Sequence, residues 1–528
     1  MGIALAALLA VPVALLIVSS GWDGVYGQDA YHYHGFATGE LRSALFALRP
    51  PAPFTWPPGF PVLTALVSLV TGPSTAAGQV VSLASGAIVP VATWALAREL
   101  RPWTGRTPAW VAVLAGVLVA CTPHLWQSAA VVMSDTTGLA AMTLGAWALV
   151  RWANGAPQRW AVLAAGTVAF AIDTRQGYAL AGLPLAVAGV VVGVRRARVP
   201  GGPGLLATLA LPLLAGALVL APMVGPMAWS ALRGEPVPFA IQLDSHPWDP
   251  GNLFRTEIVS RDGLGRWDLP MGVFYLTEPA RAYHLGAFFA LLAVGGALVV
   301  LRRPNVVAIA TLIGWPALVL GFLGGDVTQN TRFALAVLPP VAILAAIGIG
   351  RVQAWVDAIR WPRRVPGRVL PAIAVVGAVA VMLIGGLRVT SGFIDRFERD
   401  RAAIAALAAR IPAEDRIIAF QSTLALRFLG REALELYDLA ADAAVALVDD
   451  GRPTWLLVPV DADGARWADA SPGRSLAAIR GGPGLEAVEA EGAWGLWRVA
   501  PDAGGGEGPG AEPAARVTAV APMMCRPC

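Results

Sequence analysis

The dominant pattern along the chain is a series of long apolar runs separated by short polar segments. A helix needs about 20 apolar residues to cross the hydrocarbon core of a bilayer. Runs of roughly that length predict about eleven membrane-spanning helices, so we expect an α-helical polytopic membrane protein. The predicted spans lie near residues 3–20, 76–97, 108–123, 128–150, 160–174, 177–194, 204–229, 283–301, 305–324, 333–350 and 369–387.

Two apolar runs need separate interpretation. The N-terminal run is similar to a signal peptide, but it lacks a basic start and a convincing A-x-A cleavage site, so we expect a retained first span. The run near 60–71 lies between Pro61 and Gly72 and offers on the order of 15 Å of helix. That length is too short to cross, and we expect this segment to lie at the membrane surface.

The basic residues give an independent test of the topology. The chain contains no lysine, so all 39 basic residues are arginines, and cytoplasmic loops of membrane proteins collect such residues. With the N-terminus inside and 60–71 not counted as a crossing, every arginine-rich loop falls in the cytoplasm. The same count places 21–75, 230–282, 325–332 and everything after 388 on the outer face. The loops hold Arg98, Arg101 and Arg106; Arg151 and Arg159; Arg195, Arg196 and Arg198; Arg302 and Arg303; and Arg351, Arg360, Arg363, Arg364 and Arg368.

The pattern changes after about residue 390. An amphipathic helix from Arg396 to Arg410 leads into alternating strand-like and helix-like stretches, which predict a small α/β domain. We find no Gly-rich phosphate loop or nucleophile elbow there, and expect a supporting or partner-binding role. The predicted organisation is a transmembrane module over 1–388 with outer loops 21–75 and 230–282, a soluble extracytoplasmic α/β domain over 389–500, and a disordered tail over 501–528.

Composition agrees with a chain that lies largely in the membrane. Hydrophobic residues make up 56% and charged residues 14%, whereas soluble proteins have about a quarter charged. The net charge of +4 comes from arginines in short loops rather than on one face, so we expect no nucleic-acid partner. The three cysteines, Cys121, Cys525 and Cys528, define no disulfide framework, and no metal or redox role follows.

The first outer loop carries the most concentrated candidate chemistry. Asp29 follows Gln28 and precedes two tyrosines and two histidines, in the sequence G-Q-D-A-Y-H-Y-H. A carboxylate held among aromatic residues there would suit a general base. The alternative is an N-cap for a helix lying in the interface from Ala30 to Leu48. His32 and His34 are two residues apart and would lie on different faces of a helix, so we expect no shared metal ligation.

Ionisable residues near predicted span ends form a second set of candidates. Asp135 lies in the first turns of 128–150, Arg175 follows Asp173, and Arg332 follows Asp326 at another outer span end. Charges at such positions are expensive and mark candidate functional sites. An arginine there would bind a phosphate through its fork of donors. The alternative for each arginine is pairing with the neighbouring aspartate or extension to the interface.

Four motifs in order resemble those of a known group of enzymes. They are G-Q-D-A-Y-H-Y after the first span, W-P-P-G-F-P over Trp56 to Pro61, A-R-E-L-R over Ala97 to Arg101, and T-R-F-A-L-A-V-L-P-P over Thr331 to Pro340. Their order and spacing resemble the GT-C glycosyltransferases that use polyprenyl-phosphate sugars. That group contains the protein O-mannosyltransferases and the lipid A aminoarabinose transferase. The resemblance extends to about residue 500, including an outer α/β domain.

The resemblance implies a function and roles for several residues. It implies inverting transfer of a sugar from an undecaprenyl- or decaprenyl-phosphate to an envelope glycan, lipid or protein, on the outer face of a bacterial plasma membrane. Asp29 would be the base and Arg332, rather than Arg175, the phosphate partner, with no metal and no cofactor. The group often has two adjacent acids where this chain has Gln28 and Asp29, which leaves open whether the base lies elsewhere. The remaining expected substrate-binding residues are Gln28, Tyr31, His32, Trp56, Asp135 and Arg175.

Two other classes of function stay open at this point. A carrier or flippase for lipid-linked sugars would often show internal repeats and polar residues at mid-membrane depth. We detect no repeat, and the polar residues gather at the predicted outer surface. The absent second acid also fits a catalytically inactive scaffold of an envelope-assembly complex.

Overall fold

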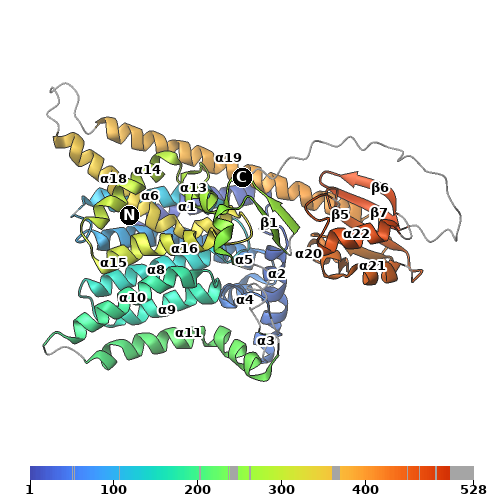
Figure 1. Cartoon of the computed structure of the whole chain (residues 1–528), viewed down its shortest axis with the longest axis horizontal. Coiled ribbons are helices and arrows are strands. Elements are labelled where there is room, and N and C mark those ends of the chain that lie inside the picture. Colours follow the sequence, from blue (N-terminus) through green and yellow to red (C-terminus); the bar gives the residue numbers. More distant parts are fainter. Residues whose placement is uncertain are drawn as a thin grey trace. The chain divides into compact units, whose positions relative to one another are not determined.

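The computed structural model describes most of the chain (Figure 1). The predicted tail over 501–528 lies outside the described residues, as do Arg106, Arg360, Arg363, Arg364 and Arg368 and the middle of the predicted 230–282 loop. The chain divides into two compact units. One comprises Met1–Val25, Tyr33–Thr256 and Asp268–Ile394; the other comprises Tyr26–His32, Glu257–Trp267 and the described residues from Asp395 onward. The described ranges are 1–49, 51–52, 54–105, 107–200, 204–235, 237, 248–260, 263–358, 369–448, 450–462, 464–481 and 485–499.

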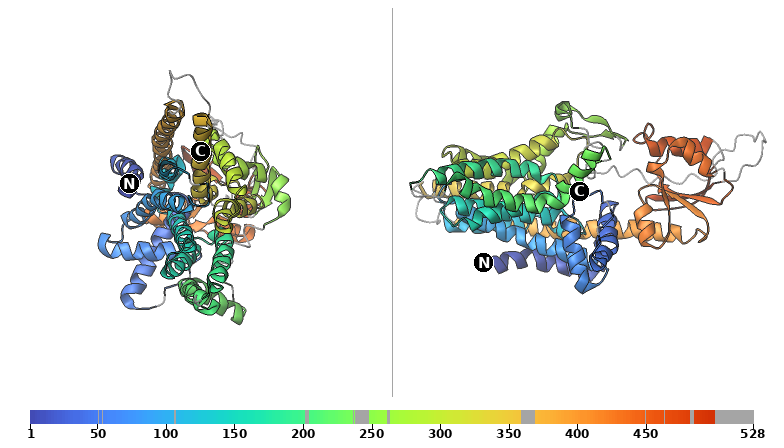
Figure 2. Two further views of the ribbon diagram at one scale, coloured as in Figure 1. Left: turned by 90° about the vertical axis from the view of Figure 1, so that its left-hand side faces the viewer. Right: turned by 90° about the horizontal axis from the view of Figure 1, so that it is seen from below.

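The first unit is built from helices, which the left view of Figure 2 shows side by side as a bundle. The helix α8 packs against α5 and α9, α9 packs against α11, and α14 packs against α18. The long helices are α1 (Gly2–Ser20), α5 (Ala76–Leu100), α6 (Ala109–Ala120), α8 (Asp135–Ala153), α9 (Arg159–Thr174), α10 (Tyr178–Ala197), α11 (Leu205–Arg233), α14 (Ala287–Leu301), α18 (Leu338–Ala358) and α19 (Val369–Ala408), the last of which continues into the second unit.

Shorter helical segments complete the first unit. They are η1 (Phe36–Leu41), α3 (Arg42–Ala47), α4 (Gly59–Thr71), α7 (Pro123–Ala129), η2 (Pro250–Phe254), α13 (Met271–Thr277), η3 (Glu278–Ala280), α15 (Val306–Ile309), η4 (Ala310–Gly314), α16 (Trp315–Leu323), α17 (Thr331–Ala334) and η5 (Leu335–Val337).

The described residues include 7 helices that are long and apolar enough to cross a membrane, or 8 if α6 and α7 form one bent span. The prediction of a multi-pass membrane protein is therefore confirmed, although fewer helices meet this standard than the eleven predicted. The predicted spans that do not meet this standard correspond to α8, α9 and α14. Helix α8 is buried along most of its length, and α9 and α14 have only 16 and 15 residues. A helix enclosed by other helices has little contact with lipid, so its composition need not be uniformly apolar.

Three predicted segments differ in detail. The predicted span 108–123 ends at Ala120, and α7 follows at an angle of 59°. The break has a local cause, since Pro123 opens α7 and has no N–H to continue the preceding helix. The run near 60–71 forms the 13-residue helix α4, short as expected. The expected helix from Ala30 is a continuous helical stretch of α2 (Asp29–Gly35), η1 and α3, with a π-helical middle.

The second unit contains a five-stranded sheet of order β4-β3-β5-β7-β6, which confirms the predicted small α/β fold. Strands β4, β3 and β5 are parallel, and β7 and β6 continue the sheet antiparallel. Residues such as Ile418, Leu456 and Ile479 form its buried core. The strands are β3 (Arg416–Ala419), β4 (Leu434–Glu435), β5 (Thr454–Pro459), β6 (Leu485–Glu491) and β7 (Trp494–Val499), and the helices are α20 (Thr423–Phe428), η6 (Leu436–Asp438), α21 (Ala441–Val448) and α22 (Ser471–Gly481).

Two earlier segments of the chain belong to this second unit. One is 26–32, which includes the start of α2. The other is a hairpin of β1 (Glu257–Ser260) and β2 (Gly263–Arg266), whose Leu264 N–H donates to the carbonyl of Arg466 at 2.8 Å. The predicted domain boundary at 388 falls inside α19, and the first unit ends at Ile394.

Candidate functional site

Three charged residues from distant parts of the sequence meet in the first unit. Asp135 is the first residue of α8, Arg175 directly follows α9, and Arg332 lies in α17. Oδ1 of Asp135 lies 2.5 Å from Nη1 of Arg175 and 3.6 Å from Nε of Arg332. Both guanidinium groups also lie over the ring of Phe333, at 5.1 and 5.7 Å from its centroid. We call these four residues the arginine cluster.

The arginine cluster contains two guanidinium groups that lie against the same carboxylate. Asp135 is 4% exposed, whereas the side chains of Arg175 and Arg332 are 23% and 21% exposed. Oδ2 of Asp135 has no hydrogen-bond partner among the described residues. A partly accessible pair of arginines held by a buried carboxylate is suited to binding an anion such as a phosphate.

Aromatic residues hold the backbone around Asp135. The hydroxyl of Tyr178 donates to the carbonyl oxygen of Asp135 at 3.3 Å, and the hydroxyls of Tyr33 and Ser134 lie 3.2 Å apart. The ring of Tyr33 in turn lies 6.1 Å from that of Trp56, one of the predicted binding residues. Tyr33 and Tyr178 were not predicted as site residues from the sequence, because tyrosines near a membrane surface are common.

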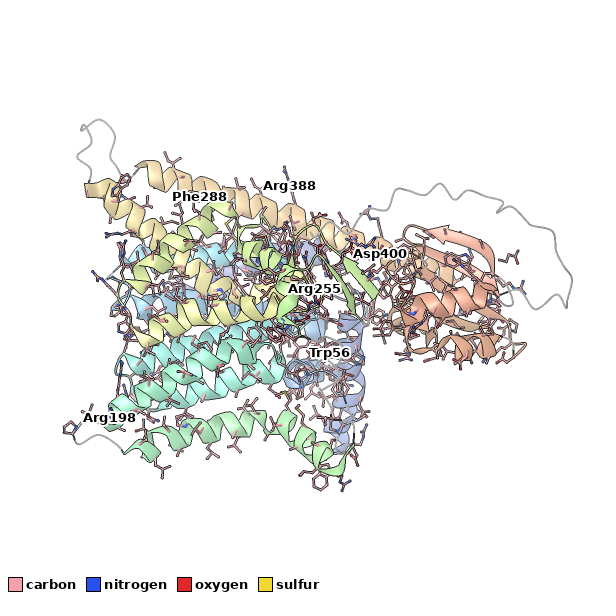
Figure 3. The ribbon with its side chains drawn as sticks, in the orientation of Figure 1. Trp56, Arg198, Arg255, Phe288, Arg388 and Asp400 are labelled. Carbon is pink, nitrogen blue, oxygen red and sulfur yellow. The ribbon has the colours of Figure 1, made fainter. Side chains whose placement is uncertain are left out.

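The arginine-rich loops lie at the other end of the same helices. Arg151 is in the last turn of α8, whose first residue is Asp135, and Arg159 opens α9, which ends just before Arg175. Figure 3 shows Arg198, after α10, at the opposite end of the helices from Trp56. The arginine cluster and the arginine-rich loops are thus separated by the length of α8 and α9.

A buried carboxylate in the first unit was not predicted from the sequence. Glu278 is fully buried, and the hydroxyl of Tyr283 lies 2.8 and 2.7 Å from its two oxygens. Nε of Arg281 lies at 3.5 Å and Nε2 of His284 at 3.4 Å from the same carboxylate, and the ring of His124 is 4.9 Å from that of His284. The run E-P-A-R-A-Y-H was the available signal, but it falls at the end of a predicted loop, where charged residues are ordinarily solvated.

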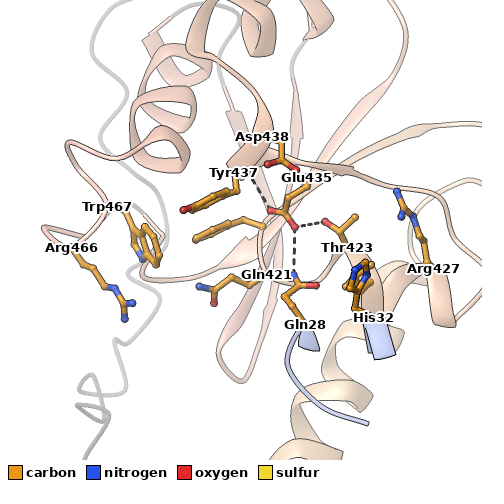
Figure 4. A pocket seen from close by; sticks show the side chains of 12 residues that line it. Gln28, His32, Gln421, Thr423, Arg427, Glu435, Tyr437, Asp438, Arg466 and Trp467 are labelled. Carbon is orange, nitrogen blue, oxygen red and sulfur yellow. Dashed lines mark hydrogen bonds between the residues drawn. The ribbon is translucent and has the colours of Figure 1, made fainter. Parts of the chain in front are cut away.

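The second unit contains a cavity of about 500 Å³, shown in Figure 4. Two predicted binding residues, Gln28 and His32, line it. Among the residues that line the cavity, the carboxylate of Glu435 accepts hydrogen bonds from Oγ1 of Thr423 at 2.7 Å and from Nε2 of Gln28 at 3.4 Å. Burial lowers the pKa of His32 and raises that of Glu435. The lining residues are Gln28, His32, Phe420, Gln421, Thr423, Leu424, Arg427, Glu435, Tyr437, Asp438, Arg466 and Trp467.

The predicted site residues are therefore distributed over both units. Asp29 and Tyr31 belong to the second unit with Gln28 and His32, and Tyr31 packs against Phe428 with ring centroids 5.3 Å apart. Asp29 is the first residue of α2, and the carbonyl of Gln28 accepts the first helical bond from His32, so the capping position expected for Asp29 belongs to Gln28. The first unit holds Trp56, Asp135, Arg175 and Arg332.

Metal ligands do not gather in the part of the chain that the structure describes. No three His, Cys, Asp or Glu residues there come close enough together to hold a metal ion. His32 and His34, which we expected not to share a metal, belong to different units. We assign no residue to metal binding.

Comparison with known proteins gives one family match and several structural likenesses. The family model for dolichyl-phosphate-mannose-protein mannosyltransferases matches residues 55–221, less than half of the chain. No curated protein sequence matches. The structure of ArnT from Cupriavidus metallidurans in the apo state is similar, with a TM-score of 0.59 and 15% identity over 93% of this chain and 97% of that chain.

Two further solved structures have the same fold. ArnT from Cupriavidus metallidurans bound to undecaprenyl phosphate matches with a TM-score of 0.56 and 15% identity, over 94% of this chain and 98% of that chain. The oligosaccharyltransferase AglB from Archaeoglobus fulgidus, in complex with an inhibitory peptide and a dolichol-phosphate, matches with a TM-score of 0.56 and 12% identity, over 94% of this chain and 74% of that one. The resemblance seen in the sequence motifs is thereby confirmed, and the chain is a multi-pass membrane protein that shares the fold of the ArnT and AglB structures.

Proposed function

We propose that the protein is a membrane glycosyltransferase that moves a sugar from a polyprenyl-phosphate donor to a glycan, lipid or protein of the cell envelope. The arginine cluster carries this proposal. Its two adjacent, partly accessible guanidinium groups suit the phosphate that links the lipid to the sugar. The ArnT structure bound to undecaprenyl phosphate and the AglB structure with a dolichol-phosphate are consistent with such a donor.

The reaction would proceed with inversion at the anomeric carbon. A hydroxyl oxygen of the acceptor attacks that carbon, the bond from the carbon to the phosphate oxygen breaks, and the polyprenyl phosphate leaves with the bonding electrons. Its leaving oxygen is already an anion, so it needs positive charge more than a proton. Arg332 and Arg175 would supply that charge, and Asp135 would hold the two guanidinium groups in place.

Asp29 is the proposed general base. It would take the proton that the acceptor hydroxyl loses during attack. The support is its position at the start of α2, partly exposed, in the motif shared with the resembling group. Gln28 stands where a second acid often occurs in that group, so the proposal assigns the proton to Asp29 alone.

The proposed location of the reaction is the outer face of a bacterial plasma membrane. Arg151 and Arg159 lie at the opposite end of α8 and α9 from Asp135 and Arg175. Because arginine-rich loops face the cytoplasm, the arginine cluster would face outward. A donor delivered on the outer leaflet would meet the cluster there.

A transfer assay in proteoliposomes tests the proposal. The donors are radiolabelled polyprenyl phosphates of mannose, arabinose, glucose and galactose, and the acceptor is an envelope extract. We expect the natural protein to move label from one donor. Asp29→Asn and Arg332→Gln should each lower the rate about 100-fold or more, the usual effect of losing a general base or a charge at the leaving group.

Matched variants control for folding. Asp23→Asn makes the same chemical change as Asp29→Asn in the same loop, and Arg302→Gln alters an exposed arginine after α14. Both should retain activity. Equal activity of Asp29→Asn and Asp23→Asn would remove Asp29 as the base while leaving the transferase intact. If a folded protein moves label from none of the donors, the carrier or the inactive scaffold replaces this proposal.

A further inference from the structure

The cavity of the second unit lies at one edge of its sheet. Strands β4, β3 and β5 are parallel neighbours, so their carboxyl ends meet at the same edge. In open sheets of this kind, ligands bind outside the carboxyl ends of the strands. Three pairs of lining residues follow these ends: Phe420 and Gln421 after β3, Tyr437 and Asp438 after β4, and Arg466 and Trp467 after β5.

The backbone at this edge has an unusual conformation. Gln421 has φ of +62°, in the left-handed region that non-glycine residues seldom adopt. Such residues persist only where the surrounding structure holds them, and they cluster at binding sites. Gln421 follows directly on the buried Phe420 and is itself exposed at the cavity.

The lining combines aromatic surface with polar groups of both signs. Tyr437 is half-buried, whereas the ring of Trp467 is almost fully buried, covered by the guanidinium of Arg466 at 4.7 Å and by the edge of Phe420. Tyr437 packs against the core of the unit on one side and is partly exposed at the cavity, where it presents aromatic surface. The carboxylates of Glu435 and Asp438 are matched by two arginines, Arg427 and Arg466, so the lining has little net charge.

These groups define the chemistry of a ligand. A balanced set of carboxylates, amides and guanidinium groups favours neither a phosphate nor a cation, but it can accept from and donate to several hydroxyls at once. The apolar face of a sugar ring fits the face of an aromatic side chain. The cavity volume of about 500 Å³ is in the usual range for sites of small ligands.

We propose that this cavity is a binding site for neutral sugar units of a glycan. A sugar ring stacks on Tyr437, and the hydroxyls of the sugar form hydrogen bonds with Asp438, Gln421 and Glu435. Hydrogen bonds from Thr423 and Gln28 hold the carboxylate of Glu435 in position. Binding here does not require the transferase reaction, so the site can be tested whether or not the protein transfers sugar.

The test is ligand-observed NMR titration of the full-length protein in a detergent without a sugar headgroup. The neutral probes are trisaccharides of mannose, galactose and arabinose, and the anionic probes are inorganic phosphate and a glucuronic-acid disaccharide. We expect at least one neutral trisaccharide to bind. Asp438→Asn should weaken that binding about tenfold, as expected for losing a charge-assisted hydrogen bond.

Asp442→Asn is the matched control, since it makes the same change at an exposed residue of α21 outside the cavity. It should bind as the natural protein does. Tyr437→Leu provides a second, uncharged test and should abolish binding while the melting temperature shows that the unit remains folded. The proposal is overturned if only the anionic probes bind, if no probe binds, or if Asp438→Asn and Tyr437→Leu bind a neutral probe as well as Asp442→Asn does.

Discussion

At the scale of single residues, Asp135 is the position on which the arginine cluster depends. Asp135→Asn removes the only charge in that cluster that opposes its two guanidinium groups. Breaking a buried ion pair by removing one partner costs about 3 kcal/mol or more. We expect a lower free energy of unfolding, measured as a lower melting temperature in detergent. Asp173→Asn is the control, because Asp173 is equally buried but its Oδ1 has no hydrogen-bond partner among the described residues. Equal losses in the two variants would contradict the role given to Asp135.

Glu435 predicts a pH dependence at the same scale. Burial, with a smaller contribution from Asp438, raises its pKa above the usual 4.5, although hydrogen bonds from Thr423 and two backbone N–H groups oppose the shift. The ionised form is therefore disfavoured in the folded state. Its penalty is absent below the usual pKa and grows as the pH rises through the raised pKa, so the second unit loses stability in that window.

The measurement is the melting temperature of the second unit from about pH 4 to about pH 7, a range that spans the titration of glutamate. Glu435→Gln should make its pH profile flatter than that of the natural protein. Glu486→Gln, at an exposed residue of β6, should leave the slope unchanged. Parallel profiles for the natural protein and Glu435→Gln would show that Glu435 does not titrate in this way.

At the scale of elements, the close packing of α14 and α18 rests on glycine. A Cβ at Gly296 of α14 would collide with the backbone carbonyl of Leu344, and one at Gly348 of α18 would collide with that of Leu292. Small residues allow such close approach between membrane helices. Gly296→Ala should force the helices apart and cost about 1–3 kcal/mol. The adjacent Gly295→Ala has open space around it and should be neutral or slightly stabilising through helix propensity. The measurement is the melting temperature of each variant, which should be lower for Gly296→Ala than for Gly295→Ala. Equal melting temperatures would be inconsistent with this packing.

At the scale of the whole molecule, the proposed topology can be tested by cysteine labelling. In a background without the natural cysteines, Asp442→Cys places a thiol on the second unit and Arg302→Cys places one after α14, both at exposed positions. A membrane-impermeant maleimide should label Asp442→Cys in intact cells, whereas Arg302→Cys should react only after the membrane is opened, because its loop collects arginines. The reverse pattern would invert the topology and place the arginine cluster on the cytoplasmic face.

Features that follow from local constraints could be predicted from the sequence. A helix that crosses a bilayer requires a long apolar run, so the multi-pass architecture was predicted from the sequence, as was the short helix α4. The change of pattern after about residue 390 likewise predicted the α/β unit, although its boundary falls inside the continuous helix α19. Asp135, Arg175 and Arg332 were recognisable because charges at span ends are costly.

Which of these groups meet depends on how the helices and strands pack, and the sequence does not show this. Asp135 pairs with Arg175, 40 residues away, because α8 packs against α9. The sequence had left open that each arginine pairs with the aspartate next to it in the chain. Glu278 is buried with Tyr283 and His284, which no local pattern separates from a solvated loop. The cavity around Glu435 exists because β4 pairs with β3 and segment 26–32 joins the second unit. The hydropathy of a segment indicates whether that segment prefers lipid or water. Contacts between side chains that are distant in the sequence depend instead on how the segments pack against one another.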